Sequence, residues 1–156
     1  MKKFVADANI GLRMLVGRAD LDAAKSQEER SQILHKIQIT HQLMVEVDAG
    51  KASLVFDDAV VEEMVFVLRS HYKMPRSDIA RSLLLLLDAD NVNASDLIRD
   101  SVRLYGTTNV DIVDIKLSLL SKSLGVPVLT WDKDFNRLNC EYYAPTDIII
   151  DDGDLS

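Results

Sequence analysis

The stretch VDIVDIKLSLLSKSLGVPVLTWDKDF, residues 110–135, places a helical pattern directly before a strand pattern. Apolar residues recur at helical spacing from residue 111 to residue 124, and Gly125 is a typical residue for ending a helix. The run VPVLTW (126–131) is almost continuously apolar, which is typical of a strand inside a parallel sheet that is covered on both faces. A helix that leads into such a strand indicates an α/β fold.

Two carboxylates lie on the helix of this stretch. Asp111 and Asp114 are three residues apart and therefore share one helix face, which Ser118 and Ser121 continue. The remaining faces are apolar, so we expect the helix to be mostly buried, where a carboxylate is costly unless it is capped, paired or bound to a metal. Asp111 could simply be the N-cap, and a favourable position in the helix dipole is the simpler explanation for Asp114.

The rest of the chain repeats this alternation of strands and helices. We expect strands at 2–6 and 52–56, a brief strand near residue 92 and an edge strand at 147–150, with helices between them. The first helix should end near Gly17, and the polar stretch 18–25 should form a loop. The pattern predicts a three-layer α/β/α sandwich with a mostly parallel central sheet, formed by residues 1–156 as a single domain with a loose tail at 151–156.

Composition narrows the class of protein. The chain has 156 residues, of which 47% are hydrophobic and 28% charged, a balance typical of a globular protein. Its single cysteine favours a reducing compartment, and with no signal-peptide pattern and no apolar run near membrane-spanning length we expect a cytoplasmic location. The net charge of −7 counts against a protein that coats nucleic acid by charge alone, but not against an enzyme whose carboxylates hold cations.

Further carboxylates are expected at the carboxyl ends of strands, where ligands bind in open α/β sheets. Asp7 directly follows the first strand and Asp132 directly follows VPVLTW, although either could merely cap the next helix. In the helix VVEEMVFVL, Glu63 borders the apolar arc and Glu62 lies nearly opposite it. We therefore expect Glu63 to turn toward a cleft and Glu62 to be a solvated surface charge.

Such a set of acids suits phosphodiester hydrolysis. That reaction needs an activated water and neutralisation of charge in the transition state, and divalent ions supply both. Mg²⁺ and Mn²⁺ prefer carboxylate oxygens, and clustered carboxylates repel one another without a cation. The three histidines have no zinc-site spacing with a cysteine, so a zinc centre is not expected.

The order of these motifs resembles the PIN-domain family, and within it the VapC-type toxins of toxin–antitoxin pairs. The likeness rests on DAN at 7–9, VVEEMVFVL at 60–68 and the stretch at 110–135, and it extends from residue 4 to about residue 138. It implies a metal-dependent endoribonuclease that cleaves RNA, a Mg²⁺ or Mn²⁺ cofactor, a homodimer and often a cognate antitoxin protein.

The resemblance also assigns roles to individual residues. It places the catalytic and metal-binding carboxylates at Asp7, Glu63, Asp114 and Asp132, with Asp134 and Asp111 as possible further ligands. Asn9 and Thr130 stand where the family has small polar residues that support the site. Candidates for weak RNA contacts near these positions are Arg13, Arg18, Arg69, Lys133 and Arg137.

Other functions remain open on the sequence alone. A PIN-fold RNA- or protein-binding module without activity would carry the same fold, although the presence of all four acids argues against it. A haloacid-dehalogenase-like phosphatase also has an aspartate after its first strand, but it requires a second aspartate where this chain has Asn9. A response-regulator receiver is weaker still, because no lysine ends a late strand.

Overall fold

The computed structural model describes residues 1–149 and confirms the α/β class. All of its described strand pairs are parallel. The strands are β1 (Lys2–Val5), β2 (Ala52–Val55), β3 (Val92–Asn93), β4 (Val128–Leu129) and β5 (Tyr142–Tyr143). The helices are α1 (Ala8–Asp22), α2 (Gln27–Asp48), α3 (Asp58–Ser70), α4 (Arg76–Leu87), α5 (Asp96–Tyr105), α6 (Ile112–Leu124), the 3₁₀ helix η1 (Lys133–Arg137) and α7 (Pro145–Ile148).

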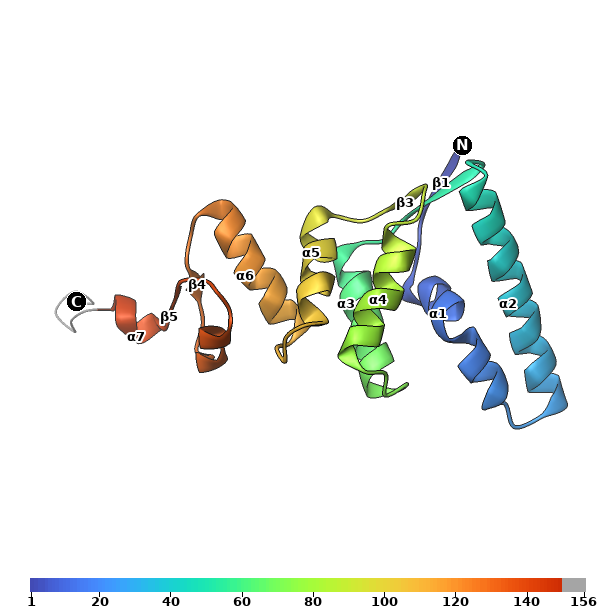
Figure 1. The fold of residues 1–156 in the computed structure, drawn as a ribbon, viewed down its shortest axis with the longest axis horizontal. Coiled ribbons are helices and arrows are strands. Elements are labelled where there is room, and N and C mark those ends of the chain that lie inside the picture. Colours follow the sequence, from blue (N-terminus) through green and yellow to red (C-terminus); the bar gives the residue numbers. More distant parts are fainter. Residues whose placement is uncertain (150–156) are drawn as a thin grey trace.

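The strands divide into two sheets rather than one. β1, β2 and β3 form a three-stranded sheet in that order, and β4 pairs with β5 in a separate two-stranded sheet. Figure 1 shows an elongated molecule in which α6, β4, β5 and α7 extend away from the first sheet and its helices. We call residues 1–110 the body and residues 111–149 the arm.

The hydrophobic core lies mainly in the body, where helix α3 is central. Its residues Val61, Met64 and Leu68 have no solvent exposure, because α3 contacts both α1 and α4. Phe56, which follows β2, is also buried and joins the first sheet to this core. The sheet and the helices of the body are therefore held by one continuous apolar cluster.

The junction between body and arm is fixed by Arg76 at the start of α4. Its Nε donates to the carbonyl of Tyr105 at 3.1 Å, its Nη2 donates to the carbonyl of Val110, and its guanidinium lies 3.6 Å from the centre of the Tyr105 ring. At Gly106 a Cβ would approach the Cβ of Ala80 to 2.7 Å, so only glycine fits there without a shift. These contacts hold the turn between α5 and α6 in one conformation.

The expected end of the first helix at Gly17 is wrong. Helix α1 continues through Gly17 to Asp22, so most of the expected loop at 18–25 is helical. A Cβ at Gly17 would lie 2.8 Å from Cγ1 of Ile37, which shows that this glycine allows α1 and α2 to pack closely. The residue serves a contact between helices and not a helix end.

The expected edge strand at 147–150 is also corrected. Asp147 and Ile148 belong to α7, which begins at Pro145, and the Asp147 carboxylate accepts a hydrogen bond from the Ala144 amide at 2.8 Å. Proline in the first turn and a capping carboxylate both favour a helix start. Residue 150 and the expected loose tail at 151–156 lie outside the described residues.

The strand predicted from VPVLTW is shorter and more exposed than its sequence suggests. Only Val128 and Leu129 pair with β5, and Leu129 remains exposed. Within residues 1–149, the helices are all too short or too polar to cross a membrane.

A leucine-to-alanine substitution, made separately at two positions of α4, tests the core packing. Leu83 is fully buried and Leu85 is 74% exposed, so the same change to alanine removes core contacts only at Leu83. We expect Leu83→Ala to lower the free energy of unfolding by about 2–5 kcal/mol, and Leu85→Ala to change it by about 0.5 kcal/mol or less. Urea denaturation followed by circular dichroism measures both. Equal losses would contradict the described packing of α4.

Candidate active site

Asp7 lies at the carboxyl end of β1, where the chain enters α1. It is exposed and caps α1, and its Oδ1 accepts a hydrogen bond from the Ala8 amide at 2.7 Å. Beside it an open groove of about 410 Å³ runs along β1. The groove is lined by Phe4, Val5, Ala6, Asp7, Asn9, Ile10, Leu43 and Leu54. Asp7 and its expected supporting residue Asn9 thus stand at the polar end of an apolar groove.

The second group of carboxylates lies in the arm around Asp114. Asp114 is half-buried in the first turn of α6, and burial raises its pKa above the usual value of 3.8. The negative charges of Asp111, Asp132 and Asp134 raise the pKa of Asp114 further. Asp111 is also the N-cap of α6, as the sequence allowed, and its carboxylate accepts from the Val113 amide at 2.8 Å. The arm therefore brings Asp111, Asp132 and Asp134 into electrostatic range of Asp114.

The loop after β4 orders the carboxylate of Asp132. The Asp132 amide donates to Oγ1 of Thr130 at 2.9 Å, and its Oδ1 accepts from the Asp134 amide at 2.8 Å. Asp132 thereby caps the helix η1. The Thr130 hydroxyl therefore holds the backbone that carries Asp132, and its supporting role in a site stays a prediction.

Asp7 and the carboxylates of the arm do not come together within one chain. Figure 1 shows the end of β1, where Asp7 lies, well apart from β4 and the loop that follows it. Among residues 1–149 no three acidic, histidine or cysteine side chains are placed so that they could hold a metal ion together. The donor set of this single-chain arrangement therefore does not fit a divalent cation.

The expectation for Glu62 is wrong. Glu62 is not a solvated charge, because its side chain is only 18% exposed and forms an ion pair with Lys116 of α6, itself 21% exposed. Glu63 is exposed on the surface of α3. The apolar arc of α3 alone leaves Glu62 on the outer side of this helix. Helix α6 packs against α3 on that side and covers Glu62.

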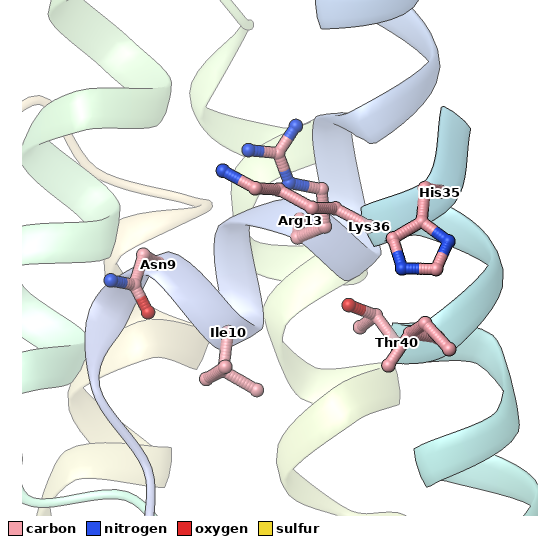
Figure 2. A pocket seen from close by; sticks show the side chains of 7 residues that line it. Asn9, Ile10, Arg13, His35, Lys36 and Thr40 are labelled. Atoms are coloured by element: carbon pink, nitrogen blue, oxygen red, sulfur yellow. The ribbon is translucent and has the colours of Figure 1, made fainter. Parts of the chain in front are cut away.

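A basic groove lies next to Asn9, between α1 and α2. Its volume is about 390 Å³. Figure 2 shows the lining side chains of Asn9, Ile10 and Arg13 from α1 and of His35, Lys36 and Thr40 from α2. Arg13, which the sequence selected, also pairs with Asp20 at 3.5 Å. His35 and Lys36 were not selected. Each is four residues from another lining residue on α2, but that spacing does not reveal which face of α2 meets α1.

The other predicted RNA-contacting residues differ in whether they already form ion pairs or hydrogen bonds within the chain. Arg18 pairs with Asp22 at 3.4 Å, and Arg69 donates to the carbonyl of Met74 at 3.0 Å. Lys133 and Arg137 lie on η1 beside Asp132, are exposed, and form no ion pair with any other described residue.

Helices around parallel strands that end in aspartates make the arrangement PIN-like. The chain is similar to a VapC ribonuclease of Aquifex aeolicus (strain VF5), with 25% identity over 128 residues that cover 80% of this chain and 90% of that protein. None of the family models or solved structures matches the chain. The similarity supports a nuclease of this general kind.

Two neighbouring substitutions on α3 test the ion pair. Glu62→Gln leaves the poorly exposed Lys116 without its counter-charge, so we expect it to lower the free energy of unfolding by about 1–2 kcal/mol. Glu63→Gln changes an exposed side chain and should cost about 0.5 kcal/mol or less. Chemical denaturation of both variants measures the difference. A larger loss for Glu63→Gln would show that α6 is not docked on α3 as described.

The raised pKa of Asp114 predicts a pH dependence of stability. In the folded chain Asp114 holds its proton to higher pH than in the unfolded chain, so its ionisation lowers stability as pH rises from 3.8 through the raised pKa. We expect Asp114→Asn to stabilise the fold at neutral pH, and the gain to disappear in acid, where the wild-type carboxyl is protonated in both states. Unfolding measured across this pH range tests the prediction. A gain that does not change with pH would contradict it.

Proposed function

We propose that this chain is a metal-dependent endoribonuclease that cleaves RNA phosphodiester bonds and acts as the toxin of a toxin–antitoxin pair. The observation that carries the proposal is the half-buried Asp114, whose pKa is raised by burial and by the negative charges of Asp111, Asp132 and Asp134. Concentrated and poorly solvated negative charge is stabilised when a divalent cation binds. Similarity to a VapC ribonuclease supports the choice of RNA as substrate.

The proposed cofactor is Mg²⁺ or Mn²⁺, held by carboxylates of both the body and the arm. Asp114 and Asp132 would contribute from the arm and Asp7 from the body, with Asp134 and Asp111 as further candidates. Glu63 is proposed as the fourth acid, on the exposed surface of α3. These carboxylates fit a cation only after the two halves of the site come together.

The RNA backbone is proposed to bind along local positive surface, because the chain as a whole carries a net charge of −7. The groove between α1 and α2 presents Arg13, Lys36 and His35, and it begins at Asn9, two residues from Asp7. Lys133 and Arg137 provide a second positive surface beside Asp132. An RNA strand whose phosphates bind at both places would run past the carboxylates that lie between these two surfaces.

A cognate antitoxin is the proposed protein partner, with a cytoplasmic location. The similarity to a VapC ribonuclease supports a partner of this kind. An inactive binding module remains the second candidate, favoured by the lack of a three-ligand metal site among residues 1–149.

Cleavage of a structured RNA by the purified protein tests the proposal. We expect cleavage with Mn²⁺ that EDTA abolishes, and a loss of about 100-fold or more in each of Asp7→Asn and Asp114→Asn, because each removes a charged ligand. Asp90→Asn is the matched control, since it makes the same change at an exposed aspartate away from these groups. Full metal-dependent cleavage by both site variants would overturn the assignment, and no cleavage by the wild type would favour the inactive module.

A further inference from the structure

The outer edge of β1 is unpaired. The Ala6 amide donates to the carbonyl of Val55 at 2.9 Å, and backbone groups alternate between the two sides of a strand. Lys3 and Val5 therefore direct their amides and carbonyls away from β2, and β1 has no other strand as a neighbour in the described chain. The side chain of Val5 is 78% exposed. A parallel strand with a free edge is a template for another strand.

Strand β4 has a free edge of the same kind. The Thr130 amide donates to the carbonyl of Tyr143 at 2.9 Å, so the backbone groups of Leu129 and Trp131 face the side opposite β5. Trp131, the single tryptophan of the chain, is 72% exposed. The sequence of this strand predicts burial on both faces, which the arm alone does not provide.

Helix α6 carries an exposed apolar stripe that leads to β4. Its members are spaced by four, three and four residues, as expected for one face of a helix. They are Val113, Leu117, Leu120 and Leu124. The stripe and the free edge of β4 together form an uncovered apolar surface on the arm.

The body offers the complementary surface. The groove of about 410 Å³ beside β1 has mainly apolar walls, including Phe4, Val5 and Leu54, and it ends at Asp7. A strand placed there parallel to β1 would bring the residue after its carboxyl end close to Asp7, because parallel strands end at the same edge of a sheet. In β4 the carboxylate that follows the strand is Asp132.

The arm cannot reach the groove of its own body without breaking the junction. Arg76 holds the carbonyls of Tyr105 and Val110 on either side of the turn before α6. The ion pair of Glu62 with Lys116 holds α6 against α3. Figure 1 shows that the arm, held in this way, extends away from β1. A second copy of the chain meets no such restriction.

We propose that two copies exchange their arms, so that β4 of each copy lies parallel beside β1 of the other. The order β3-β2-β1 would then continue into β4 and β5 of the second copy and form one parallel sheet. Each composite site would combine Asp7 of one copy with Asp114 and Asp132 of the other. The exchange itself rests on the free edges and the groove, whereas the catalytic role of the composite site rests on the proposed function.

Cross-linking tests the exchange without measuring activity. Val5→Cys and Leu129→Cys are combined with Cys140→Ser, which removes the single natural cysteine, and the protein is treated with a short bis-maleimide. We expect a covalent dimer on a denaturing gel. In a second experiment, a chain with only Val5→Cys is mixed and refolded with a tagged chain that has only Leu129→Cys. The cross-linked product should contain one tagged and one untagged chain. An internally linked monomer, or no cross-link, would overturn the exchange.

Complementation between inactive variants tests the composite site. When Asp7→Asn and Asp114→Asn chains are refolded together, half of the dimers are mixed, and each mixed dimer keeps one intact site. Activity should therefore return to about a quarter of the wild-type value. The matched control pairs Asp114→Asn with Asp132→Asn, both in the arm, and should restore nothing because every site then carries a defect.

The outcomes separate the two proposals. RNA cleavage by the wild type, together with only internally linked monomer from the Val5→Cys, Leu129→Cys chain, would retain the nuclease and reject the exchange. A covalent dimer from that double-cysteine chain, together with no RNA cleavage by the wild type, would retain the exchange and reject the nuclease. Active wild type with no recovery in the Asp7→Asn and Asp114→Asn mixture, although the mixed dimer forms, would reject the composite site.

Discussion

The hydrogen-bonding edges of β1 govern the arrangement of this molecule. One edge pairs with β2 in a parallel ladder from Lys2 to Val5, and that pairing fixes where β1 ends and α1 begins. Asp7 occupies this boundary because its carboxylate caps α1. The other edge is bonded by no described strand. The position of Asp7 and the open groove beside it are therefore two consequences of the same half-paired strand.

The distribution of carboxylates follows from the division into body and arm. Asp114 already carries a cost, because burial and three neighbouring acids disfavour its charged form. Adding Asp7 to this group without a cation would increase the repulsion. A chain that keeps Asp7 on the body and the other acids on the arm avoids that cost until the two parts meet. In the proposed composite site these charges would oppose assembly in the absence of a cation, and a bound cation would favour it.

Local features of the fold could be predicted from sequence because their causes lie within a few residues. Asp111 caps α6 by accepting from the Val113 amide at 2.8 Å, and Gly125 ends the same helix in the left-handed conformation. Both follow from local backbone chemistry. The α/β class and the parallel pairing were also predicted from periodicity. The position of Asp132 just after β4 belongs to the same category.

The features that sequence did not predict depend on contacts between distant segments. Gly17 looked like a helix end, but its role is set by Ile37, twenty residues away. Glu62 looked solvated because its partner Lys116 lies on another helix. The VPVLTW pattern predicts a covered strand, whereas Leu129 and Trp131 are exposed in this chain. A hydrophobic pattern does not specify whether a covering strand belongs to the same chain. Burial is encoded locally, whereas the identity of the neighbour is not.

The direction of the arm also depends on contacts between distant segments, and these lie in the body. Helix α5, against which α6 packs, is anchored by Ile98 and Val102, both fully buried in the body. Arg76 connects this helix to the turn before α6, and burial lowers the pKa of its guanidinium while the Tyr105 ring and two carbonyls stabilise the charge. The direction of the arm is therefore set by core packing that contains none of the candidate carboxylates. Because β4 and Asp132 belong to the arm, their position relative to Asp7 depends on this packing in the body.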